Sequence, residues 1–385
     1  MKILNLTFDS FENDSRILKE SISLSSMGHY LCVMAHGNQN LKTEERQENF
    51  YIKRVSYLNR EVKNTFFKKI YAYFKYLYLT SKYTKEFDVL HCNDLDTLPV
   101  AFFVKKFYNP NISVVYDAHE HETERHHQSN FLKKMLKIEE KFLLKYVDHV
   151  ITVSEPIADD YVKLYQIRKP SIIYNAPHKF SIKKQDLFRE KFNIPQENII
   201  FLYQGGLQEG RGILEFFDLI KEKKNISYVV MGFGFLKNKL VELSKTHDNL
   251  YFHDAVSPNI LLNYTSSADI GVCIEENKCK SWDFALPNKV FEYHMVGLPV
   301  LVSGLSELKR FIKNYHTGFI LNDIFNQQEF NELLPIIIKE YQHKKNYIQK
   351  VQNIYNWEEQ EKKLFTIYMN LEKNLNKKGK TKNVK

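Results

Sequence analysis

Short apolar runs alternate with amphipathic stretches through the first 175 residues of the chain. Continuous apolar strands separated by helices of ten or more residues are typical of a parallel sheet covered on both faces. The expected strands are Lys2–Thr7, Tyr30–Ala35, Val89–Cys92, Ser113–Tyr116, His149–Val153 and Ser171–Tyr174. The expected helices are Ser15–Met27, Leu98–Phe107, Phe131–Tyr146 and Pro156–Tyr165.

The turn-forming residues Asn175 and Pro177 interrupt this pattern, which then starts again. The second set of strands is Ile199–Tyr203, Ser227–Met231, Leu250–His253, Ile270–Ile274 and Val300–Val302, and its helices are Ile213–Leu219, Phe235–Thr246, Ile260–Ser267, Asn288–Val296 and Leu305–Phe311. Each half therefore predicts its own doubly wound α/β domain. Ligands bind beyond the carboxyl ends of such strands, so two facing domains predict a cleft that grips one substrate with each domain.

Composition supports a globular protein of two domains. The chain has 385 residues, of which 43% are hydrophobic and 26% charged. No apolar run approaches the ~18 residues that span a bilayer, and the first residues lack the pattern of a signal peptide. The four Cys form no C-x-x-C pair, which excludes a zinc ribbon and favours a reducing compartment, hence a cytoplasmic location.

The net charge of +9 is concentrated at the C-terminus. Residues 371–385 hold six Lys and one Glu, so the rest of the chain carries only +4, which argues against a nucleic-acid binder. We expect 371–385 to be a disordered basic tail, with weak attraction to anionic lipid as the alternative.

Two glycine turns follow strands of the second half. Gly205 and Gly206 lead through Arg211 into a helix, and Gly232 and Gly234 follow the next strand. Glycines let a phosphate or a nucleoside approach the backbone, and a helix N-terminus attracts anions. A tight strand-to-helix turn is the equally simple alternative for each.

A third element, from Ala285 to Val300, contains a helix that starts at Asn288 and ends before Gly297. Lys289, like Arg211, lies near a helix start, where the dipole disfavours a cation unless an anion is nearby. Glu292 lies one turn further on and can accept two hydrogen bonds from a ribose diol. For an isolated Glu, a solvated position would be the simpler interpretation.

Together these three elements resemble the nucleotide-sugar signature of GT-B glycosyltransferases, especially those of the retaining family 4. The resemblance implies that Glu292, five residues before Gly297, holds the donor ribose. It implies that Arg211 belongs to the diphosphate loop and that the backbone at Asn288 and Lys289 meets the diphosphate. The same resemblance covers nearly the whole chain, including a terminal helix from Trp357 to Tyr368 that crosses back to the first domain.

The first domain contributes His119, which follows a strand in the run Asp117–Glu120. The resemblance makes it the cleft histidine, which orients donor sugar and acceptor or polarises an acceptor hydroxyl. The zincin spacing H-E-x-x-H is not met around His119 and His121, so we expect no metal site.

Three departures from the family pattern matter, one of which is that the loop from Phe8 to Asn13 lacks the glycines that many members use near the donor phosphate. Phe284 stands where the first Glu of E-x7-E is usual, and Gly205 and Gly206 stand where an Arg is usual. Lys289 is expected to compensate for the missing Arg. The segment 64–85 is aromatic and basic; core packing is the simpler interpretation, and an edge in peripheral contact with a membrane is the alternative.

The sequence therefore predicts domains at 1–178 (acceptor) and 179–355 (nucleotide sugar), with a helix at 356–370 packing back on the first. The predicted activity is transfer of a sugar, with retention, from a UDP- or GDP-type donor to a hydroxyl of a glycan or lipid-linked acceptor. His119, Arg211 and Lys289 are the predicted catalytic residues. An epimerase or hydrolase of the same fold, or a degenerate sugar-nucleotide-binding subunit, is the alternative.

Overall fold

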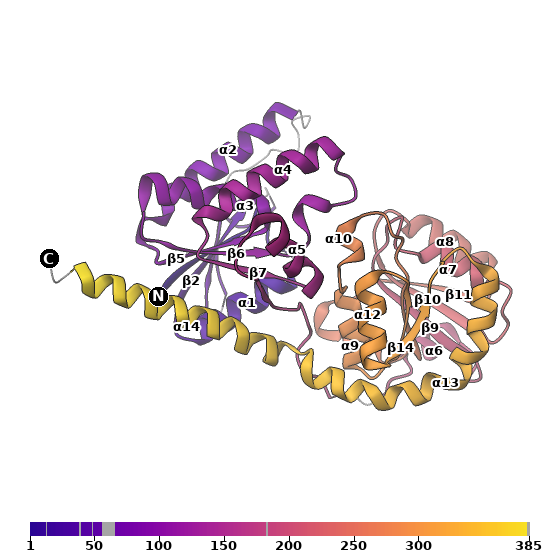
Figure 1. Ribbon diagram of the computed structural model, residues 1–385. Coiled ribbons are helices and arrows are strands. Elements are labelled where there is room, and N and C mark those ends of the chain that lie inside the picture. The colour runs from indigo at the N-terminus through magenta and orange to yellow at the C-terminus, as the bar shows by residue number, and fades with distance from the viewer. Residues whose placement is uncertain (13, 38–39, 48, 56–65, 182–183, 383–385) are drawn as a thin grey trace. The chain divides into compact units, whose positions relative to one another are not determined.

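The computed structural model describes residues 1–12, 14–37, 40–47, 49–55, 66–181 and 184–382, of which 66–69 and 378–382 are described by backbone alone. The chain forms two compact units (Figure 1). Unit 1 is Met1–Asn175 with Glu361–Lys385, and unit 2 is Ala176–Gln360. The chain thus passes between the units at 175/176 and 360/361, within a few residues of the expected boundaries.

The described part of unit 1 is built on an eight-stranded sheet of order β3-β4-β2-β1-β5-β6-β7-β8. All neighbours are parallel except the edge strand β3, which is antiparallel to β4. The strands are β1 Lys2–Leu6, β2 Tyr30–His36, β3 Glu44–Arg46, β4 Tyr51–Val55, β5 Val89–Asn93, β6 Ser113–Ala118, β7 His149–Thr152 and β8 Ser171–Ile172. The sequence did not predict β3 and β4, because these two strands carry polar and half-exposed side chains instead of an apolar run.

The helices of unit 1 connect these strands and cover both faces of the sheet (Figure 1). The helices α2, α3 and α4 lie on one face, and α1 and α14 lie on the other. The carboxylate of Asp14 caps α1 by accepting from two backbone N–H groups, and Ser154 caps α5. The elements are α1 Ser15–Ser26, α2 Phe66–Tyr83, α3 Asp94–Phe103, α4 Asn130–Leu143, α5 Glu155–Tyr165, and the short turns η1 Thr84–Glu86, η2 Val104–Tyr108, η3 Glu122–Glu124 and η4 Leu144–Tyr146.

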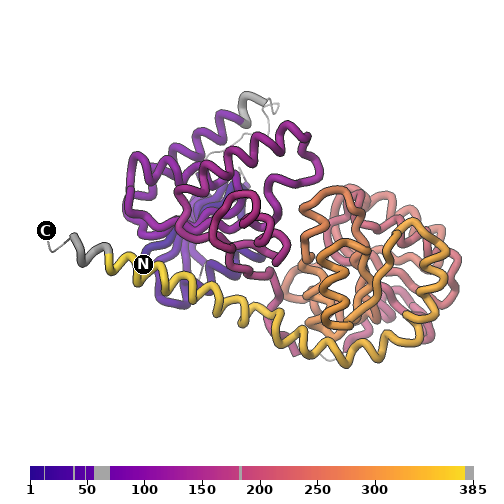
Figure 2. The backbone as a smooth tube through the Cα atoms, in the orientation of Figure 1, coloured from indigo at the N-terminus to yellow at the C-terminus, as the bar shows by residue number. Residues whose placement is uncertain are grey.

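The helix α14, Trp357–Lys382, returns the chain to unit 1. Figure 2 shows it, in yellow, running alongside the first unit. Leu364, Ile367 and Leu371 are buried, and the hydroxyl of buried Tyr368 lies 2.6 Å from His91 Nδ1. The terminal helix expected from the sequence is therefore present.

The expected disorder from residue 371 is wrong for residues 371–382, which continue α14 as helix. Helix propagation needs no new nucleus, and Leu371 anchors the last turns. Residues 383–385 lie outside the described part of the chain.

Unit 2 contains a parallel six-stranded sheet in its described residues, of order β11-β10-β9-β12-β13-β14. The strands are β9 Ile199–Gly206, β10 Ile226–Phe233, β11 Leu250–Asp254, β12 Ile270–Cys273, β13 Val300–Ser303 and β14 Gly318–Leu321. The helices are α6 Leu187–Phe192, α7 Ile213–Ile220, α8 Lys237–Thr246, α9 Pro258–Thr265, α10 Lys280–Asp283, α11 Asn288–Met295, α12 Ser306–Tyr315 and α13 Gln327–Ile354.

The two faces of this second sheet pack differently. On one face, Phe216 of α7 contacts the rings of Phe201, Tyr228 and Phe330. On the other, the hydroxyl of Tyr293 on α11 lies 3.0 Å from the carbonyl oxygen of Leu202. A Cβ at Gly271 would come within 2.3 Å of that tyrosine ring, so only glycine lets α11 lie this close to β12.

In both sheets the order of strands reverses beside the first strand of the unit, at β1/β5 and at β9/β12. These reversals are the switch points at which doubly wound sheets open a crevice. The prediction of two doubly wound α/β domains with a C-terminal helix returning to the first is confirmed. Among the described residues, no helix combines the length and the apolar character that crossing a bilayer requires.

Candidate functional site

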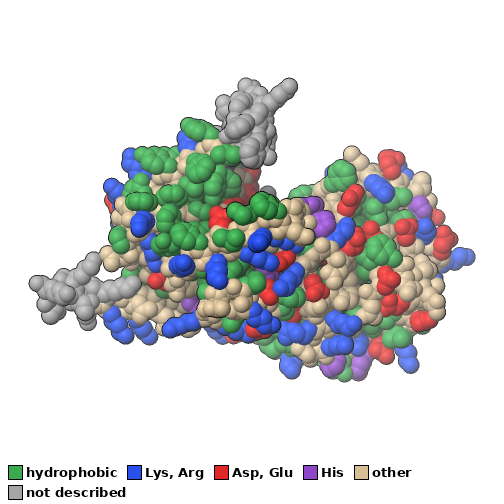
Figure 3. All heavy atoms as spheres, turned by 45° about the horizontal axis from the view of Figure 1, so that its top comes forward, with side chains coloured by type: hydrophobic (Ala, Val, Ile, Leu, Met, Phe, Trp, Pro, Cys, Tyr) green, Lys and Arg blue, Asp and Glu red, His purple; other side chains and the backbone are tan. Residues whose placement is uncertain are grey.

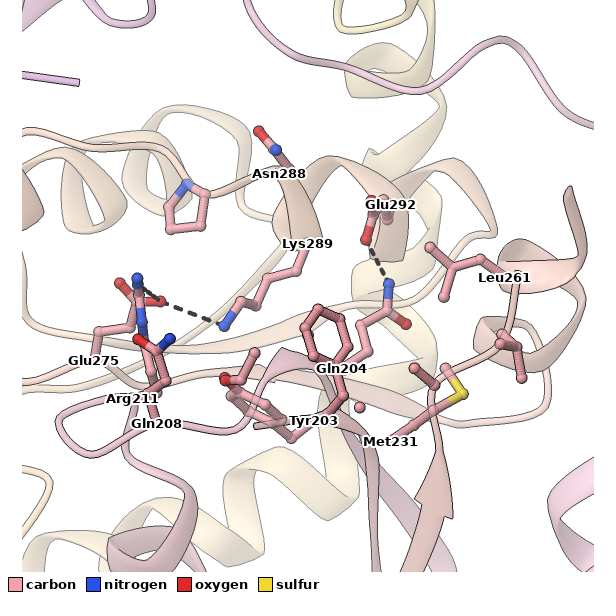
Figure 4. A pocket seen from close by; sticks show the side chains of 17 residues that line it. Tyr203, Gln204, Gln208, Arg211, Met231, Leu261, Glu275, Asn288, Lys289 and Glu292 are labelled. Carbon is pink, nitrogen blue, oxygen red and sulfur yellow. Dashed lines mark hydrogen bonds and ion pairs between the residues drawn. The ribbon is translucent and has the colours of Figure 1, made fainter. Parts of the chain in front are cut away.

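A cavity of about 400 Å³ opens in unit 2 at the carboxyl ends of β9, β10 and β12, which is the switch point of that sheet. Figure 4 shows its side chains converging from these strands and from α11. Most residues that the sequence proposed for the donor site line it together: Gly205, Gly206, Arg211, Gly232, Asn288, Lys289 and Glu292. Gly234 and Phe284 are not among the lining residues, and His119 belongs to unit 1.

The glycines of the two turns serve different purposes. A Cβ at Gly205 or Gly206 would meet nothing within 4 Å, so this loop leaves open space. A Cβ at Gly232 would lie 1.9 Å from the carbonyl oxygen of Gly205, and one at Gly234 would lie 2.7 Å from that of Leu207. Close approach of the neighbouring loop therefore explains the glycines at 232 and 234 without a ligand.

Arg211 and Lys289 meet at a carboxylate that the sequence analysis missed. Glu275 follows β12, is almost fully buried, and accepts from Arg211 Nη1 at 2.8 Å and from Lys289 Nζ at 3.3 Å. Its backbone N–H donates to the Ser303 hydroxyl at 3.0 Å. An acidic residue directly after a buried strand of the predicted second sheet was the signal that could have drawn attention to it.

This cluster is ionised throughout. Burial lowers the pKa of Lys289, but attraction by Tyr203 and Glu275 outweighs it, and the pKa is raised. Burial alone would raise the pKa of Glu275, but Lys289 and Arg211 hold it below its ordinary value. Aromatic rings support both cations: Arg211 lies 4.7 Å from the Trp282 ring centroid and Lys289 lies 4.3 Å from that of Tyr203.

Both cations thus lie near helix starts because a carboxylate neutralises them in the free protein. A cation near a helix start is disfavoured by the helix dipole unless an anion is nearby, and here that anion is Glu275. The nearby carboxylate of Glu275 means that these positions do not require a bound phosphate, and binding of the donor phosphates by Arg211 and Lys289 stays a prediction. The cavity thus contains two positive charges, Arg211 and Lys289, that both donate to Glu275 and that a diphosphate could also bind.

Glu292 lies further along the same wall, one turn beyond Lys289 on α11 (Figure 4). It accepts a hydrogen bond of 2.6 Å from Gln204 Nε2. The other end of that amide is fixed, because Gln204 Oε1 accepts from Thr265 Oγ1 at 2.8 Å. Gln204 was not predicted as a site residue, yet it aims the carboxylate of Glu292 at the cavity.

In unit 1, His119 lies just beyond the carboxyl end of β6 and faces acceptor oxygens on both sides of its ring. Nε2 lies 3.0 Å from Asn93 Oδ1 and 3.3 Å from Asp117 Oδ2, and Nδ1 lies 3.8 Å from Asp94 Oδ1. The amide of Asn93 cannot turn round, because its Nδ2 donates to the carbonyl oxygen of Leu6 at 2.7 Å. Nε2 is therefore placed as a hydrogen-bond donor, while Nδ1 lies at ion-pair distance from the carboxylate of Asp94.

Electrostatics agree with this geometry. Burial lowers the pKa of His119, but attraction by Asp94 and then Asp117 raises it to about 10. The side chain, which is 16% exposed, is an imidazolium at neutral pH. It is suited to donate a hydrogen bond or to stabilise negative charge, and not to act as a general base.

Behind His119 lies a buried charged cluster. Arg16 donates from Nε and Nη2 to the two oxygens of Asp117, each at 2.8 Å, and its Nε lies 3.3 Å from Glu20. Glu20, His91 and Asp117 offer ligand atoms within 4.8 Å of one another, as a metal site would. The guanidinium of Arg16 already takes the place of the cation there, so these residues do not fit a metal ion.

Comparison with solved structures shows that the chain has the GT-B fold. Sucrose-phosphate synthase of Thermosynechococcus elongatus superposes with a TM-score of 0.78 at 16% identity, over 96% of this chain and 99% of that one. Anabaena HepE in complex with UDP gives a TM-score of 0.70 at 13% identity, over 98% and 100%. At such identities the likeness concerns the fold alone.

Comparison of the sequence with models of protein families identifies the family. Residues 17–176 match the family model Glycosyltransferase Family 4, and residues 184–354 match Glycosyl transferases group 1. The chain therefore belongs to the family 4-like glycosyltransferases of the GT-B fold, which confirms the resemblance seen in the sequence.

A curated relative is the O-antigen biosynthesis glycosyltransferase WclY of Escherichia coli, which is 24% identical over 231 residues. This alignment covers 58% of the present chain and spans 63% of the length of WclY.

Proposed function

We propose that this protein transfers a glycosyl group from a nucleotide-diphosphate sugar of UDP or GDP type to a hydroxyl of a glycan or lipid-linked acceptor, with retention. The observation that carries the proposal is the pair Arg211 and Lys289 beside Glu292 in the switch-point cavity. WclY, by its name, serves O-antigen biosynthesis, which supports cell-surface polysaccharide synthesis as the setting. The solved complexes of HepE with UDP and UDP-glucose support the type of donor.

Arg211 and Lys289 would bind the diphosphate and stabilise the charge that grows on it as the glycosidic bond breaks. They are fixed by Glu275 and by aromatic rings before any ligand arrives, so little reorganisation is needed during the reaction. Glu292, held by Gln204, would accept hydrogen bonds from the ribose hydroxyls.

Retention would follow from substitution on the front face of the sugar. In that reaction an oxygen of the departing diphosphate accepts the proton of the acceptor hydroxyl, and the acceptor oxygen bonds to the anomeric carbon. A cationic His119 suits this mechanism, because it stabilises negative charge and leaves proton removal to the diphosphate. Phe284 offers no carboxylate for a covalent intermediate.

A screen of UDP, GDP and their sugars by thermal unfolding tests the donor site. A ligand at 100 times its dissociation constant adds about 2.7 kcal/mol to the free energy of unfolding. We expect the wild-type protein to respond to one base, and Glu292→Gln to lose most of that response. Glu242→Gln, on the exposed side of α8 in the same unit, is the matched control.

Absence of any response to nucleotides, or an equal response from Glu292→Gln, would refute the donor site. Release of free nucleotide in the presence of a hydroxyl acceptor then separates a transferase from a degenerate binding subunit. Turnover without acceptor would favour the hydrolase alternative.

A further inference from the structure

The helix α4 of unit 1 turns its apolar side chains outward. Phe131 is 75% exposed and Ile138 is 57% exposed, and Leu132, Met135 and Phe142 are exposed as well. The buried residues of this helix are only Glu140 and Leu143. A helix that covers a sheet normally buries its apolar stripe, so α4 presents the reverse arrangement.

Contacts of Glu140 fix this orientation. The carboxylate is fully buried and accepts hydrogen bonds from the hydroxyls of Tyr116 at 2.7 Å, Tyr161 at 2.5 Å and Tyr165 at 2.5 Å. Rotation of α4 about its axis would break all three. The hydrogen bonds of Glu140 therefore fix the orientation in which the apolar side of α4 faces outward.

The apolar surface continues onto the neighbouring elements. The ring of Phe142 lies 5.5 Å from Phe102 of α3, which lies 6.5 Å from Phe107, a side chain that is 65% exposed. Figure 3, in which the top of Figure 1 comes forward, shows hydrophobic side chains gathered on the side of unit 1 that carries α2, α3 and α4, with lysines around them. We call the exposed set the α4 face; it comprises Phe107, Phe131, Leu132, Met135, Ile138 and Phe142.

The charges around the α4 face are mainly positive. Lys134 and Lys141 are exposed on α4 itself, and Lys106 is exposed beside Phe107. Lys145 lies with its Nζ 5.8 Å from the Phe142 ring. The exposed side of α4 also carries one negative charge, Glu139. The other acidic residue of the helix, Glu140, is buried.

We propose that the α4 face is a docking surface for an anionic lipid bilayer. Aromatic and aliphatic side chains rimmed by lysines on a helix lying along the surface match the interface of such a membrane. A second copy of the chain fits less well, because a two-fold contact would bring the same lysines against each other. The surface differs from the expected aromatic segment at 64–85, since it centres on α4.

Docking would bring the His119 end of unit 1 close to a lipid-linked acceptor, a consequence that rests on the proposed function. The loop after β6 carries both His119 and Glu124, and Glu124 forms ion pairs with Lys133 and Lys137 of α4. The same short connection therefore ties the candidate acceptor residue to the proposed membrane contact.

Sedimentation with vesicles tests the docking surface. We expect the full-length protein to bind vesicles of phosphatidylcholine mixed with phosphatidylglycerol and not vesicles of phosphatidylcholine alone. The double variant Phe131→Ser/Ile138→Ser should lose binding, and Lys134→Gln/Lys141→Gln should weaken it about fivefold for each lysine removed. The matched control is Ile336→Ser/Ile338→Ser, which removes two exposed isoleucines from α13 of unit 2.

Phe142→Trp gives a second readout, since a tryptophan on the α4 face should shift its emission to the blue when vesicles are added. Equal binding by wild type and both α4 variants, binding that ignores lipid charge, or no binding would overturn the proposal. A concentration-dependent dimer that Phe131→Ser/Ile138→Ser abolishes would overturn it in favour of a second copy. Nucleotide-induced stabilisation of each variant, measured in parallel, shows that it is folded and tests the proposed function separately.

Discussion

Glu275 holds Arg211 and Lys289 through one carboxylate oxygen, Oε1. A bound diphosphate would compete with this oxygen for the same two cations. In the proposed donor site the carboxylate would therefore have two effects: it would stabilise the free protein, and it would limit the affinity for a diphosphate by partly neutralising the two cations.

We predict that Glu275→Gln lowers the free energy of unfolding by about 3 kcal/mol, since it leaves two partly buried cations without their counter-charge. Added nucleoside diphosphate should stabilise this variant more than the wild type, because the phosphates then supply the missing charge. Urea unfolding with and without ligand measures both effects.

Glu276→Gln is the matched control, because this neighbouring carboxylate pairs with Lys278 instead. An unchanged stability in Glu275→Gln, or a ligand response no greater than that of the wild type, would show that Glu275 does not balance the cation pair.

His119 gives a prediction for pH. Its pKa is raised from 6.5 to about 10 in the folded protein, because Asp94 and Asp117 outweigh the effect of burial. A raised folded pKa contributes stability that is fully present below the unfolded value and is lost as pH rises through the folded value. The stability lost in His119→Gln should therefore be greatest below about pH 6.5 and should shrink between pH 6.5 and about 10.

Thermal unfolding of both proteins across this range checks the prediction. His127→Gln, an exposed histidine of the same loop, should show no such trend. A difference between wild type and His119→Gln that grows above pH 7 would mean that His119 is neutral in the folded protein.

At the scale of elements, the orientation of α4 depends on one buried side chain, Glu140. Three tyrosine hydroxyls from β6 and α5 converge on Glu140, so this carboxylate replaces the apolar stripe by which helices usually pack. The exposed side of α4 is then free for the lysines and apolar residues of the α4 face.

We predict that Glu140→Gln costs roughly 2–3 kcal/mol of unfolding free energy, since the hydrogen bonds use both oxygens of Glu140 and an amide has one acceptor oxygen. Glu139→Gln, the next residue on the exposed side, should cost little. Chemical denaturation of the two variants provides the comparison, and equal losses would argue against the role assigned to Glu140.

At the scale of the whole molecule, the chain leaves unit 1 after Asn175 and returns to it at Glu361. The returning helix α14 buries Leu364, Ile367, Tyr368 and Leu371, and Tyr368 meets His91 in the middle of the first sheet. Unit 1 is thus assembled from two distant parts of the sequence.

We predict that a chain ending after Gln360 has an unstable unit 1, while one ending after Lys373 retains its stability. Full burial of each such side chain is worth about 1.5–3 kcal/mol, so losing four approaches the stability of a typical domain. Limited proteolysis reports on each unit separately. Equal resistance of unit 1 in both truncated chains would show that α14 is dispensable.

Much of this molecule follows from local pattern. Buried parallel strands read as continuous apolar runs, and glycine turns after them mark where a ligand site is expected. That pattern alone left a plain turn or a solvated helix as an equally simple interpretation of Arg211, Lys289 and Glu292, and the resemblance to the family singled them out. They do line one cavity. His119, at the end of β6, was also proposed from the resemblance.

The tertiary structure alone decided how those residues are held. Glu275 meets Arg211, which lies 64 residues earlier, because β9 and β12 are neighbours in the sheet although not in the chain. Asn93 and His119 meet for the same reason at the ends of β5 and β6. Strand pairing brings such ends together from distant parts of a sequence, so no local pattern records which carboxylate balances which cation, or which side of α4 faces the solvent.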